Sequence, residues 1–431
     1  MEESKGHQIY DSDHHKDQAS VPFLVSDAPL SLDPKLVKEL QEIGHTIVAY
    51  MDAVSFLYKT HQDIHELLDH GKPSQFHGNE PNYLFVRPDL IITPQGFKIC
   101  EIEVSPFGLA LSDILGKAYS DRSLAHDPEF LKAFVAANTP ASGTFIYSDK
   151  TQRFAGQLGY LADAVYGDRK DEQGNQWNVS HIRDHANRPD SQVYRGYYLH
   201  EAQKDSMLEA LTHMCTTLPS PTPFFEEKAL LALIWDTRFA GSFNQLLGDS
   251  DFARMRELIP PTWIVGQEQY FEPGLPGGAT TTLELAGMGK KQRQVVIKSS
   301  GYCDNMSWGH GVHFLDKVSG ASAIEHIAEI NNGLGDSLYI GQQYCPPEKV
   351  SFTYFTNGPT SEIQEQAMGC RITPYYCATG SNKGELLTVK ATGRNGSRYI
   401  HAATDSVNTA VGASSTPLTP IERVPWHEHA R

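Results

Sequence analysis

The sequence predicts a mixed α/β (α+β) protein in which antiparallel sheets are flanked by helices. Over residues 31–167, segments with apolar residues at helical spacing alternate with short apolar segments that are typical of buried strands. From Val295 onward, short segments alternate polar and apolar residues, as half-buried antiparallel strands do. At 431 residues, of which 40% are hydrophobic, the chain is long enough to bury a substantial core.

The first half of the chain is expected to alternate helices and strands. Residues 31–70 have a Ser/Asp start signal and helical spacing, which predicts two helices or one long bent helix. Residues 87–108 follow as strands, and residues 105–121 as a loop that leads into a helix. Residues 142–149 then predict a buried strand, and residues 151–167 the helix after it.

The second half is expected to be richer in strands. Residues 169–192 are polar and lack a clear period, so we expect an insertion or an extended loop there. Residues 224–263 read as helical and end in a Pro-Pro stop signal, and residues 271–294 are loop-rich. Strands are expected at residues 295–300, 338–345, 350–356, 370–379 and 386–392.

The composition argues against several function classes. A formal charge of −16 argues against nonspecific binding to nucleic acid. The six cysteines lie far apart without a C-x-x-C pair, so we expect reduced thiols rather than a disulfide scaffold. No apolar run approaches the roughly 18 residues of a membrane span, and the N-terminal residues lack the apolar core of a secretory signal. We therefore expect a cytoplasmic protein that binds neither nucleic acid nor membrane.

Three carboxylates lie in the otherwise apolar segment 87–108. The sequence Pro94-Gln95-Gly96 predicts a three-residue turn with the glycine in the left-handed conformation. Such a turn sets the facing pairs Thr93–Phe97, Ile91–Ile99, Asp89–Glu101 and Arg87–Glu103. These side chains then share one face of the sheet, with the β-carbons of facing residues about 4.5–5.5 Å apart.

Carboxylates this close together repel one another unless a cation neutralises them. Hard divalent cations bind carboxylate oxygens, and Mg²⁺ commonly combines one or two carboxylates with the phosphates of a substrate. The pattern therefore indicates Mg²⁺ binding by Asp89, Glu101 and Glu103. Arg87 is placed to orient Glu103 or to contact a transferred phosphoryl group. The alternative is an exposed strand face with solvated charges.

A second candidate group begins with the apolar strand that ends at Lys298. Glycines in the loop after it, Gly301, Gly309 and Gly311, let backbone N–H groups approach a phosphate closely. The segment contains neither G-x-x-x-x-G-K-[ST] nor G-x-G-x-x-G, so a plain glycine-containing hairpin or loop is the alternative.

Three further features are weaker candidates. The strand at 338–345 ends in Gln342 and Gln343, which are placed to read the edge of a base, although an ordinary strand end has the same sequence features. The C-terminal region holds basic residues that are candidates for phosphate or carboxylate binding, or for solvated strand faces: Arg371, Lys390, Arg394 and Arg398. The histidine pairs His61/His65 and His310/His313 have spacings that zinc can use, but no H-E-x-x-H motif or cysteine ligand accompanies them.

Taken together, these segments resemble the ATP-grasp superfamily, in particular its circularly permuted ligases, the glutathionylspermidine synthetases and eukaryotic-type glutathione synthetases. In that family a strand pair of the form R-x-D and E-x-N carries the magnesium ligands, and here it stands as Arg87-Pro88-Asp89 and Glu101-Ile102-Glu103. The segment "VVIKSSG" looks like the family's lysine strand, and "YIGQQYCPP" like the segment that passes the adenine. One departure is Glu103, which stands where the family has asparagine and adds a negative charge.

The resemblance implies an ATP-grasp fold with a circularly permuted element order and a reaction that uses ATP and Mg²⁺. A carboxylate of one small molecule would be phosphorylated by ATP, and the amine of another would attack the acyl phosphate to form an amide. Arg87 would contact the phosphoryl oxygens, and Asp89, Glu101 and Glu103 would hold Mg²⁺. The implied ATP-binding residues are Lys298, Ser299, Ser300, Gly301, Gly309, Gln342, Gln343 and Tyr344.

The same resemblance organises the chain and leaves two other functions open. We expect an α/β region over 21–270 with the acidic strand pair and the substrate part. A nucleotide-cradling sheet and lid would span 271–413, with tails at 1–20 and 414–431. The alternatives to a ligase are a small-molecule kinase with the same nucleotide site, or a catalytically silent protein that binds nucleotide.

Overall fold

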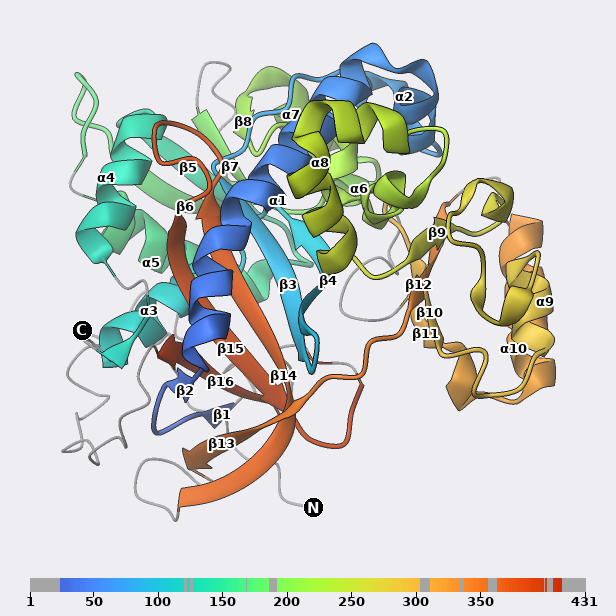
Figure 1. Ribbon diagram of the computed structural model, residues 1–431. Coiled ribbons are helices and arrows are strands. Elements are labelled where there is room, and N and C mark those ends of the chain that lie inside the picture. Colours follow the sequence, from blue (N-terminus) through green and yellow to red (C-terminus); the bar gives the residue numbers. More distant parts are fainter. Residues whose placement is uncertain are drawn as a thin grey trace.

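The computed structural model describes residues 24–119, 122–124, 127–167, 169–185, 192–302, 311–333, 337–355, 363–398, 400 and 406–412. The expected tails at 1–20 and 414–431 lie outside these residues. The described chain forms three sheets with helices packed around them, which confirms the mixed α and β class (Figure 1).

The largest sheet collects strands from both ends of the chain. Its main path runs in the order β1-β16-β15-β14-β3-β4, with β13 paired to β14 and β2 to β16. The division predicted at residue 270 is therefore crossed by strand pairing. The strands are β1 (Leu24–Val25), β2 (Leu30–Ser31), β3 (Phe85–Thr93), β4 (Gly96–Glu103), β13 (Lys349–Phe355), β14 (Ile363–Cys377), β15 (Leu386–Arg394) and β16 (Ser406–Gly412).

The hairpin of β3 and β4 confirms the two facing pairs of charged residues. Arg87 lies opposite Glu103, and Asp89 lies opposite Glu101. Nearer the turn the predicted pairing is wrong by one residue. Thr93 pairs with Gly96 instead of Phe97, and Ile91 pairs with Lys98 instead of Ile99.

The error at the turn is compensated further along β4. The turn has two residues, Pro94 and Gln95, and Gly96 follows with a φ of 95°. One extra residue, Cys100, then forms a β-bulge between the pairs Asp89–Glu101 and Leu90–Ile99. The bulge shifts the register back by one residue, so the carboxylates return to the face that the simpler hairpin predicted.

The two faces of the large sheet differ sharply in polarity. Helix α1 (Pro34–Thr60) crosses the apolar face, which contributes Val86, Leu90, Ile372 and Tyr376 to the main core (Figure 1). The approach is close because α1 has a glycine at the contact. A β-carbon on Gly44 would lie 2.3 Å from Tyr376 Cδ1 and 2.2 Å from a backbone oxygen. The opposite face carries the charged side chains of β3 and β4.

The region 31–70 forms two helices, which confirms the first of the two alternatives predicted for it. Asp33 caps α1 by accepting from the backbone N–H of Lys35 at 2.8 Å, and Pro34 occupies the first turn, where it costs no hydrogen bond. The chain then turns at His61 into α2 (Gln62–Asp69). The loop expected at 105–121 leads into α3 (Leu109–Tyr119), which packs on β15 and β16.

A second sheet is antiparallel and has the order β11-β10-β12-β9. Its strands are β9 (Thr262–Ile264), β10 (Val295–Ser299), β11 (Val312–Phe314) and β12 (Tyr339–Gln343). Helices α9 (Thr282–Gly287) and α10 (Gly320–Gly333) lie on its outer side (Figure 1). The expected strands at 295–300 and 338–345 are confirmed here as antiparallel neighbours.

A third sheet is entirely parallel, with the order β6-β5-β7-β8. Its strands are β5 (Gly143–Tyr147), β6 (Trp177–His181), β7 (Gln192–Gly196) and β8 (Thr216–Leu218). The helices around it are α4 (Pro128–Asn138), α5 (Ala155–Tyr160), α6 (Leu199–Ala202) and α7 (Ser206–Met214). The strand predicted at 142–149 is confirmed. The loop predicted at 169–192 is wrong for residues 177–181, because Trp177 is buried and starts a strand.

The segment 224–263 is less helical than its apolar spacing predicts. It begins with short 3-10 turns at Pro223–Glu226, Lys228–Leu231 and Leu233–Trp235, and becomes α8 only at Ala240–Leu258. Gly248 interrupts α8 with a φ of 76°. Tertiary packing explains the difference, since residues 229–234 are almost completely buried in the main core and have little room for a regular helix.

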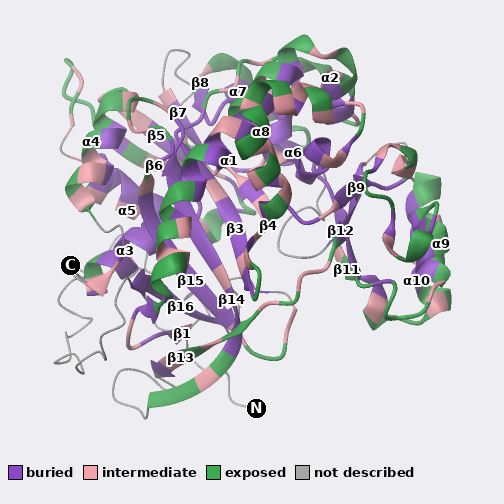
Figure 2. Cartoon of the chain, viewed as in Figure 1, coloured by how far each residue is buried: buried purple, intermediate pink, exposed green. Residues whose placement is uncertain are grey.

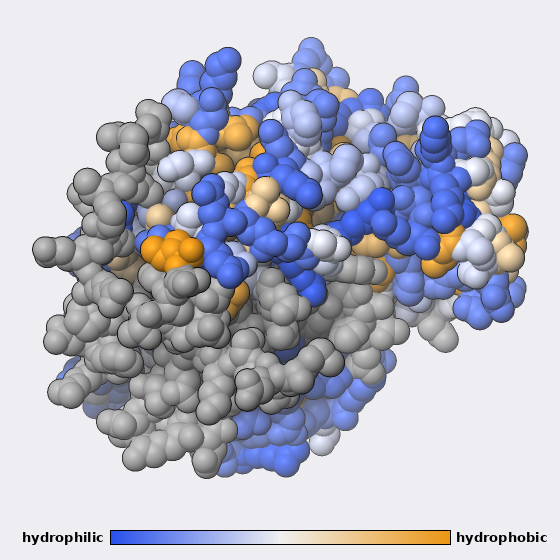
Figure 3. Space-filling view, turned by 90° about the horizontal axis from the view of Figure 1, so that it is seen from below, coloured by the Kyte–Doolittle hydropathy of each residue, from blue (hydrophilic) through white to orange (hydrophobic). Residues whose placement is uncertain are grey.

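Buried residues concentrate where the sheets meet their covering helices, and most of the outer helix faces are exposed (Figure 2). Seen from below, the described surface is mainly hydrophilic, with small separate hydrophobic areas (Figure 3). Within the described residues, no helix is both long and apolar enough to cross a membrane. Five described cysteines are free thiols: Cys100, Cys215, Cys345, Cys370 and Cys377.

Candidate functional site

A band of charged side chains runs across the polar face of the large sheet. It begins with Glu101 and Glu103 on β4, continues with Arg87 and Asp89 on β3, and extends to β14 and β15. The pairing of Arg371 with Ile91, and of Thr373 with Lys390, brings the later strands alongside the hairpin. The charged face therefore joins residues that lie far apart in the sequence.

Asp89 is the most deeply buried of the three carboxylates, with a side chain only 3% exposed. Arg371 donates to one of its oxygens at 2.8 Å and Thr373 to the other at 3.2 Å. Burial disfavours the charged carboxylate, but the guanidinium groups of Arg371 and Arg87 outweigh burial and lower the pKa of Asp89. Asp89 is therefore ionised and fixed in place by its neighbours.

Glu103 is paired with Arg87, as the hairpin register predicts. Ser105 donates to the same carboxylate at 3.0 Å, and Arg87 also donates to the backbone oxygen of Phe107 at 2.9 Å. Burial raises the pKa of Glu103, an effect that Arg87 only partly offsets. The Nε atoms of Arg87 and Arg371 are buried and have no hydrogen-bond partner. The Nε atom of Arg87 faces Asp89 Oδ1 at 3.9 Å, and both guanidinium groups are held by their carboxylate partners.

Glu101 is paired with a lysine that the sequence prediction missed. Nζ of Lys228 lies 2.8 Å from Oε1 of Glu101, and the lysine side chain is 8% exposed. Lys228 follows two acidic residues in "FFEEKALL", and all three charged residues are largely buried. Three consecutive charged residues inside an apolar segment are a sequence signal that Lys228 has a specific partner. The interpretation of residues 224–263 as helical hid this signal.

Lys298 reaches the same face from the second sheet. Its Nζ donates to the backbone oxygen of Cys100 at 2.8 Å and to Oε1 of Gln342 at 2.7 Å. Gln342 in turn donates to Thr262 at 3.0 Å. The bulge at Cys100 therefore supplies an acceptor for Lys298, and burial lowers the pKa of Lys298. Gln342 accepts a hydrogen bond from Lys298, and its predicted contact with an adenine stays a prediction.

Lys390 completes the set of cations on the large sheet. It is 4% exposed, and Nζ lies 3.4 Å from Oγ1 of Thr392. Burial lowers its pKa to about 7, repulsion from Arg371 and Arg87 acts in the same direction, and Asp89 opposes both. Of the four basic residues proposed for phosphate or carboxylate binding, Arg371 and Lys390 join the charged face.

The lowered pKa of Lys390 predicts that the free energy of unfolding depends on pH. Because the folded pKa lies below the ordinary lysine value of 10.5, the unfolded chain binds more protons between pH 7 and pH 10.5. The free energy of unfolding should therefore rise with pH in this window, with a contribution from Lys390 of about 1.4 kcal/mol per pH unit. Urea denaturation at pH 7.5, 8.5 and 9.5 measures this slope.

Lys390→Met should remove that contribution, and Lys132→Met on the exposed side of α4 should keep the wild-type slope. An unchanged slope in Lys390→Met would show that Lys390 does not lose its proton in this range.

The other predicted residues lie at the margins of the charged face or away from it. Gln343 is exposed at the end of β12. Tyr344 and Phe314 pack against Arg398, whose guanidinium lies 4.2 Å from the Tyr344 ring and binds Asp316 through two bonds of 2.7 and 2.9 Å. Arg394 lies at the end of β15, where it pairs with Gly369 of β14.

The segment after Lys298 packs tightly against residues 226–229. The backbone N–H of Ser299 donates to Gly311 at 2.8 Å. Ser300 bonds to both the backbone and the side chain of this neighbouring segment. A β-carbon on Gly301 would lie 2.4 Å from both a backbone oxygen of Glu226 and a side-chain oxygen of Glu227. Gly309 lies outside the described residues.

The zinc alternative finds little support in the part of the chain that the structure describes. There, no group of three His, Cys, Asp or Glu side chains is arranged to hold a metal ion. His61 packs edge-on against Phe239, and His65 stacks on Tyr58. His313 lies 4.0 Å from His326, ring centre to ring centre, and His310 is outside the described residues.

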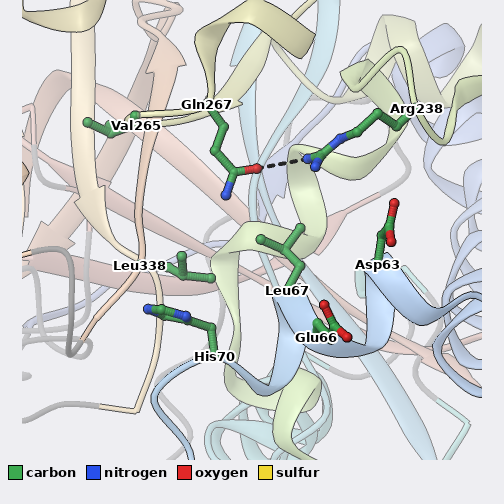
Figure 4. A pocket seen from close by; sticks show the side chains of 9 residues that line it. Asp63, Glu66, Leu67, His70, Arg238, Val265, Gln267 and Leu338 are labelled. Carbon is green, nitrogen blue, oxygen red and sulfur yellow. Dashed lines mark hydrogen bonds between the residues drawn. The ribbon is translucent and has the colours of Figure 1, made fainter.

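An open pocket of about 480 Å³ lies between α2 and the ends of the second sheet (Figure 4). Its lining includes Asp63 and Glu66 on one side and Arg238 on the other. Arg238 is already bound, since it donates to Gln267 at 2.8 Å and pairs with Asp236. The pocket shares no lining residue with the charged face, so it is a separate feature of the surface.

Comparison with known proteins places the fold. No protein-family model matches the chain, and no curated protein has a matching sequence. Among solved structures, a glutathione synthetase-like effector from Globodera pallida, in its apo form, is similar over 93% of this chain and 95% of its own, with a TM-score of 0.53 and 9% identity. The chain has a glutathione-synthetase-like fold.

A second structure, described as a candidate gamma-glutamylcysteine synthetase from Methylobacillus flagellatus, covers 92% of this chain and 93% of its own. Its TM-score is 0.45 and its identity is 10%. At 9% identity, the similarity to the effector structure shows a shared fold only.

Proposed function

We propose that this protein is an ATP-dependent carboxylate–amine ligase of the circularly permuted ATP-grasp type, acting on small molecules through an acyl phosphate. The observation that carries the proposal is the charged face, on which Asp89, Glu101 and Glu103 lie among five buried or nearly buried basic side chains. The basic residues are Arg87, Lys228, Lys298, Arg371 and Lys390.

The charges on this face suit a polyphosphate with a divalent ion. Basic side chains outnumber carboxylates on this face by five to three, and the excess attracts phosphate oxygens even though Lys390, with a pKa of about 7, is only partly charged at neutral pH. The guanidinium groups of Arg87 and Arg371, whose side chains are 11% and 16% exposed, supply donors for such oxygens. Asp89, Glu101 and Glu103 supply oxygen ligands of the kind that Mg²⁺ prefers. Because the described residues contain no three such side chains already arranged for a metal ion, these carboxylates would hold Mg²⁺ only together with phosphate oxygens. When bound, Mg²⁺ neutralises charge on the phosphates during their transfer.

In the proposed reaction, an oxygen of the substrate carboxylate attacks the γ-phosphorus of ATP, and the bond from that phosphorus to the bridging oxygen of ADP breaks. The amine of the second substrate then attacks the acyl carbon, a C–N bond forms, and phosphate leaves. Arg87, Arg371 and Lys298 stabilise the transferring phosphoryl group, because their charges are fixed in a site that excludes most water. Lys390 adds a basic side chain on the neighbouring strand.

The test is a screen for ADP release with Mg²⁺-ATP and pools of amino acids, small carboxylic acids and amines. We expect Mg²⁺-ATP alone to raise the melting temperature, and one acid and amine pair to stimulate ADP release with formation of an amide, detected by mass spectrometry. A phosphorylated product without an amide would identify a kinase.

Binding of ATP without turnover for any pool would identify a silent nucleotide-binding protein. If ATP neither shifts the melting temperature nor is consumed, the nucleotide site itself is wrong.

A further inference from the structure

One arginine outside the charged face connects the large sheet with the second sheet. Arg398 follows β15, and its guanidinium binds Asp316 through two bonds of 2.7 and 2.9 Å. The same guanidinium lies 4.2 Å from the ring centre of Tyr344 and 5.3 Å from that of Phe314. We call these four residues the Arg398 clasp. A two-bond pair of a guanidinium with a carboxylate has a fixed geometry, so the clasp sets the distance between the two segments that it joins.

The clasp lies at the edge of the second sheet that is opposite the attachment of that sheet to the main core. The strand order is β11-β10-β12-β9, and Ile264 of β9 and Ile340 of β12 pack in the main core. Phe314 ends β11, and Asp316 lies in the turn η11 (Leu315–Lys317) directly after it. One edge of the sheet is therefore anchored by apolar packing, and the other is held by an ion pair with ring contacts.

The strand between these two edges carries part of the proposed nucleotide site. β10 pairs with β11, and its Lys298 reaches the bulge of β4. We propose that the Arg398 clasp holds the second sheet closed over the charged face, so that a nucleotide enters and leaves when the clasp opens. The inference rests on the proposed nucleotide-binding function and adds to it the control of access to that site.

The burial of the clasp suits a contact that opens and closes. The side chain of Asp316 is 9% exposed and that of Arg398 is 24% exposed. An ion pair at this depth gains more from its charges than a fully exposed pair does, and both groups regain water when they separate. Opening the clasp leaves Ile264 and Ile340 in the main core, so the sheet stays attached at the β9 side.

A clasp of this kind affects rates of binding more than affinity. All of its partners belong to the protein, so it stabilises the closed form with and without nucleotide. Its removal should raise the open fraction in both states, and association and dissociation should become faster by similar factors. Loss of a direct contact with the nucleotide would instead speed dissociation alone and weaken the affinity.

The experiment is stopped-flow fluorescence with an ATP analogue that carries a fluorophore on its ribose, in the presence of Mg²⁺ and without other substrates. In Arg398→Met, both rate constants should rise about tenfold, while the dissociation constant changes less than about threefold. Asp316→Asn should have the same effect. The double variant should be no faster than either single variant, because the two residues act through one contact.

Arg238→Met is the matched control, because it removes the same kind of contact at the anchored side of the sheet. Arg238 binds Asp236 with bonds of 3.0 and 2.6 Å and lies 3.9 Å from the ring centre of Tyr270. This variant should keep the wild-type rate constants.

Three results would overturn the inference and leave the proposed function standing. They are faster dissociation with unchanged association in folded Arg398→Met, unchanged rate constants in folded Asp316→Asn, and an equal acceleration in Arg238→Met. If the analogue does not bind to wild type at all, the proposed function itself is overturned.

Discussion

Replacing Glu101 with alanine is expected to lower the rate of ATP-dependent ADP release at least about a hundredfold. The change removes a carboxylate at the centre of the charged face, one that lies 2.8 Å from the buried ammonium group of Lys228. Because Glu101 itself is 27% exposed, the chain should still fold. The measurement is the initial rate of ADP formation with the substrates that the screen identifies.

The control is Glu101→Gln, which preserves the volume and a hydrogen bond to Lys228 but removes the negative charge. We expect its melting temperature to stay closer to that of wild type while its ADP release is also strongly reduced. If folded Glu101→Ala turns over at a rate near that of wild type, Glu101 does not act in the reaction.

Removing Glu227 is expected to destabilise the fold by about 3–5 kcal/mol. Nζ of Lys72 lies 2.7 Å from Glu227, and the two side chains are 0% and 2% exposed. Glu227→Ala would leave the lysine charge buried without its carboxylate, and would also remove the acceptor of the Ser300 hydroxyl. Urea denaturation at neutral pH measures the free energy of unfolding directly.

Two comparisons identify the cause of that loss. The double variant Lys72→Met/Glu227→Leu removes both charges and should lose less stability than Glu227→Ala, because no uncompensated charge remains. The exposed pair Lys38–Glu42, 3.6 Å apart on α1, is the matched surface case. Glu42→Ala should change the free energy by about 0.5 kcal/mol or less. Similar losses at Glu227 and Glu42 would contradict the argument.

The sequence allowed a correct prediction of the charged pairs for a reason that is partly fortuitous. A three-residue turn and an unbroken hairpin predict the same partners for Asp89 and Arg87 as a two-residue turn with a bulge. The bulge had a signal, because the buried residues of β4 change parity, from Phe97 and Ile99 to Ile102. This change in the alternation of buried and exposed residues along β4 predicts the position of the bulge.

The rest of the charged face depends on contacts that a single sequence does not specify. Lys390 and Arg371 could be named as candidates because basic residues are scarce in an acidic chain, but their position beside Asp89 follows from the pairing of β14 with β3. Lys228 reaches Glu101 because packing breaks the expected helix into short turns. The bonds of Gln342 to Lys298 and Thr262 follow from strand pairing with β9 and β10, which the sequence does not specify, and its place beside an adenine stays a prediction.

The strand order of the large sheet has a consequence for how the site comes into being during synthesis. β4 ends at Glu103, whereas β14, the other neighbour of β3, begins only at Ile363. At usual elongation rates of about 5–20 residues per second, the acidic hairpin waits on the order of ten seconds or more for that partner. Until then Asp89 has neither Arg371 nor Thr373. During this interval the unpaired edge of β3 is a template for pairing with other chains, and the charged face of the hairpin is the feature that discourages such association.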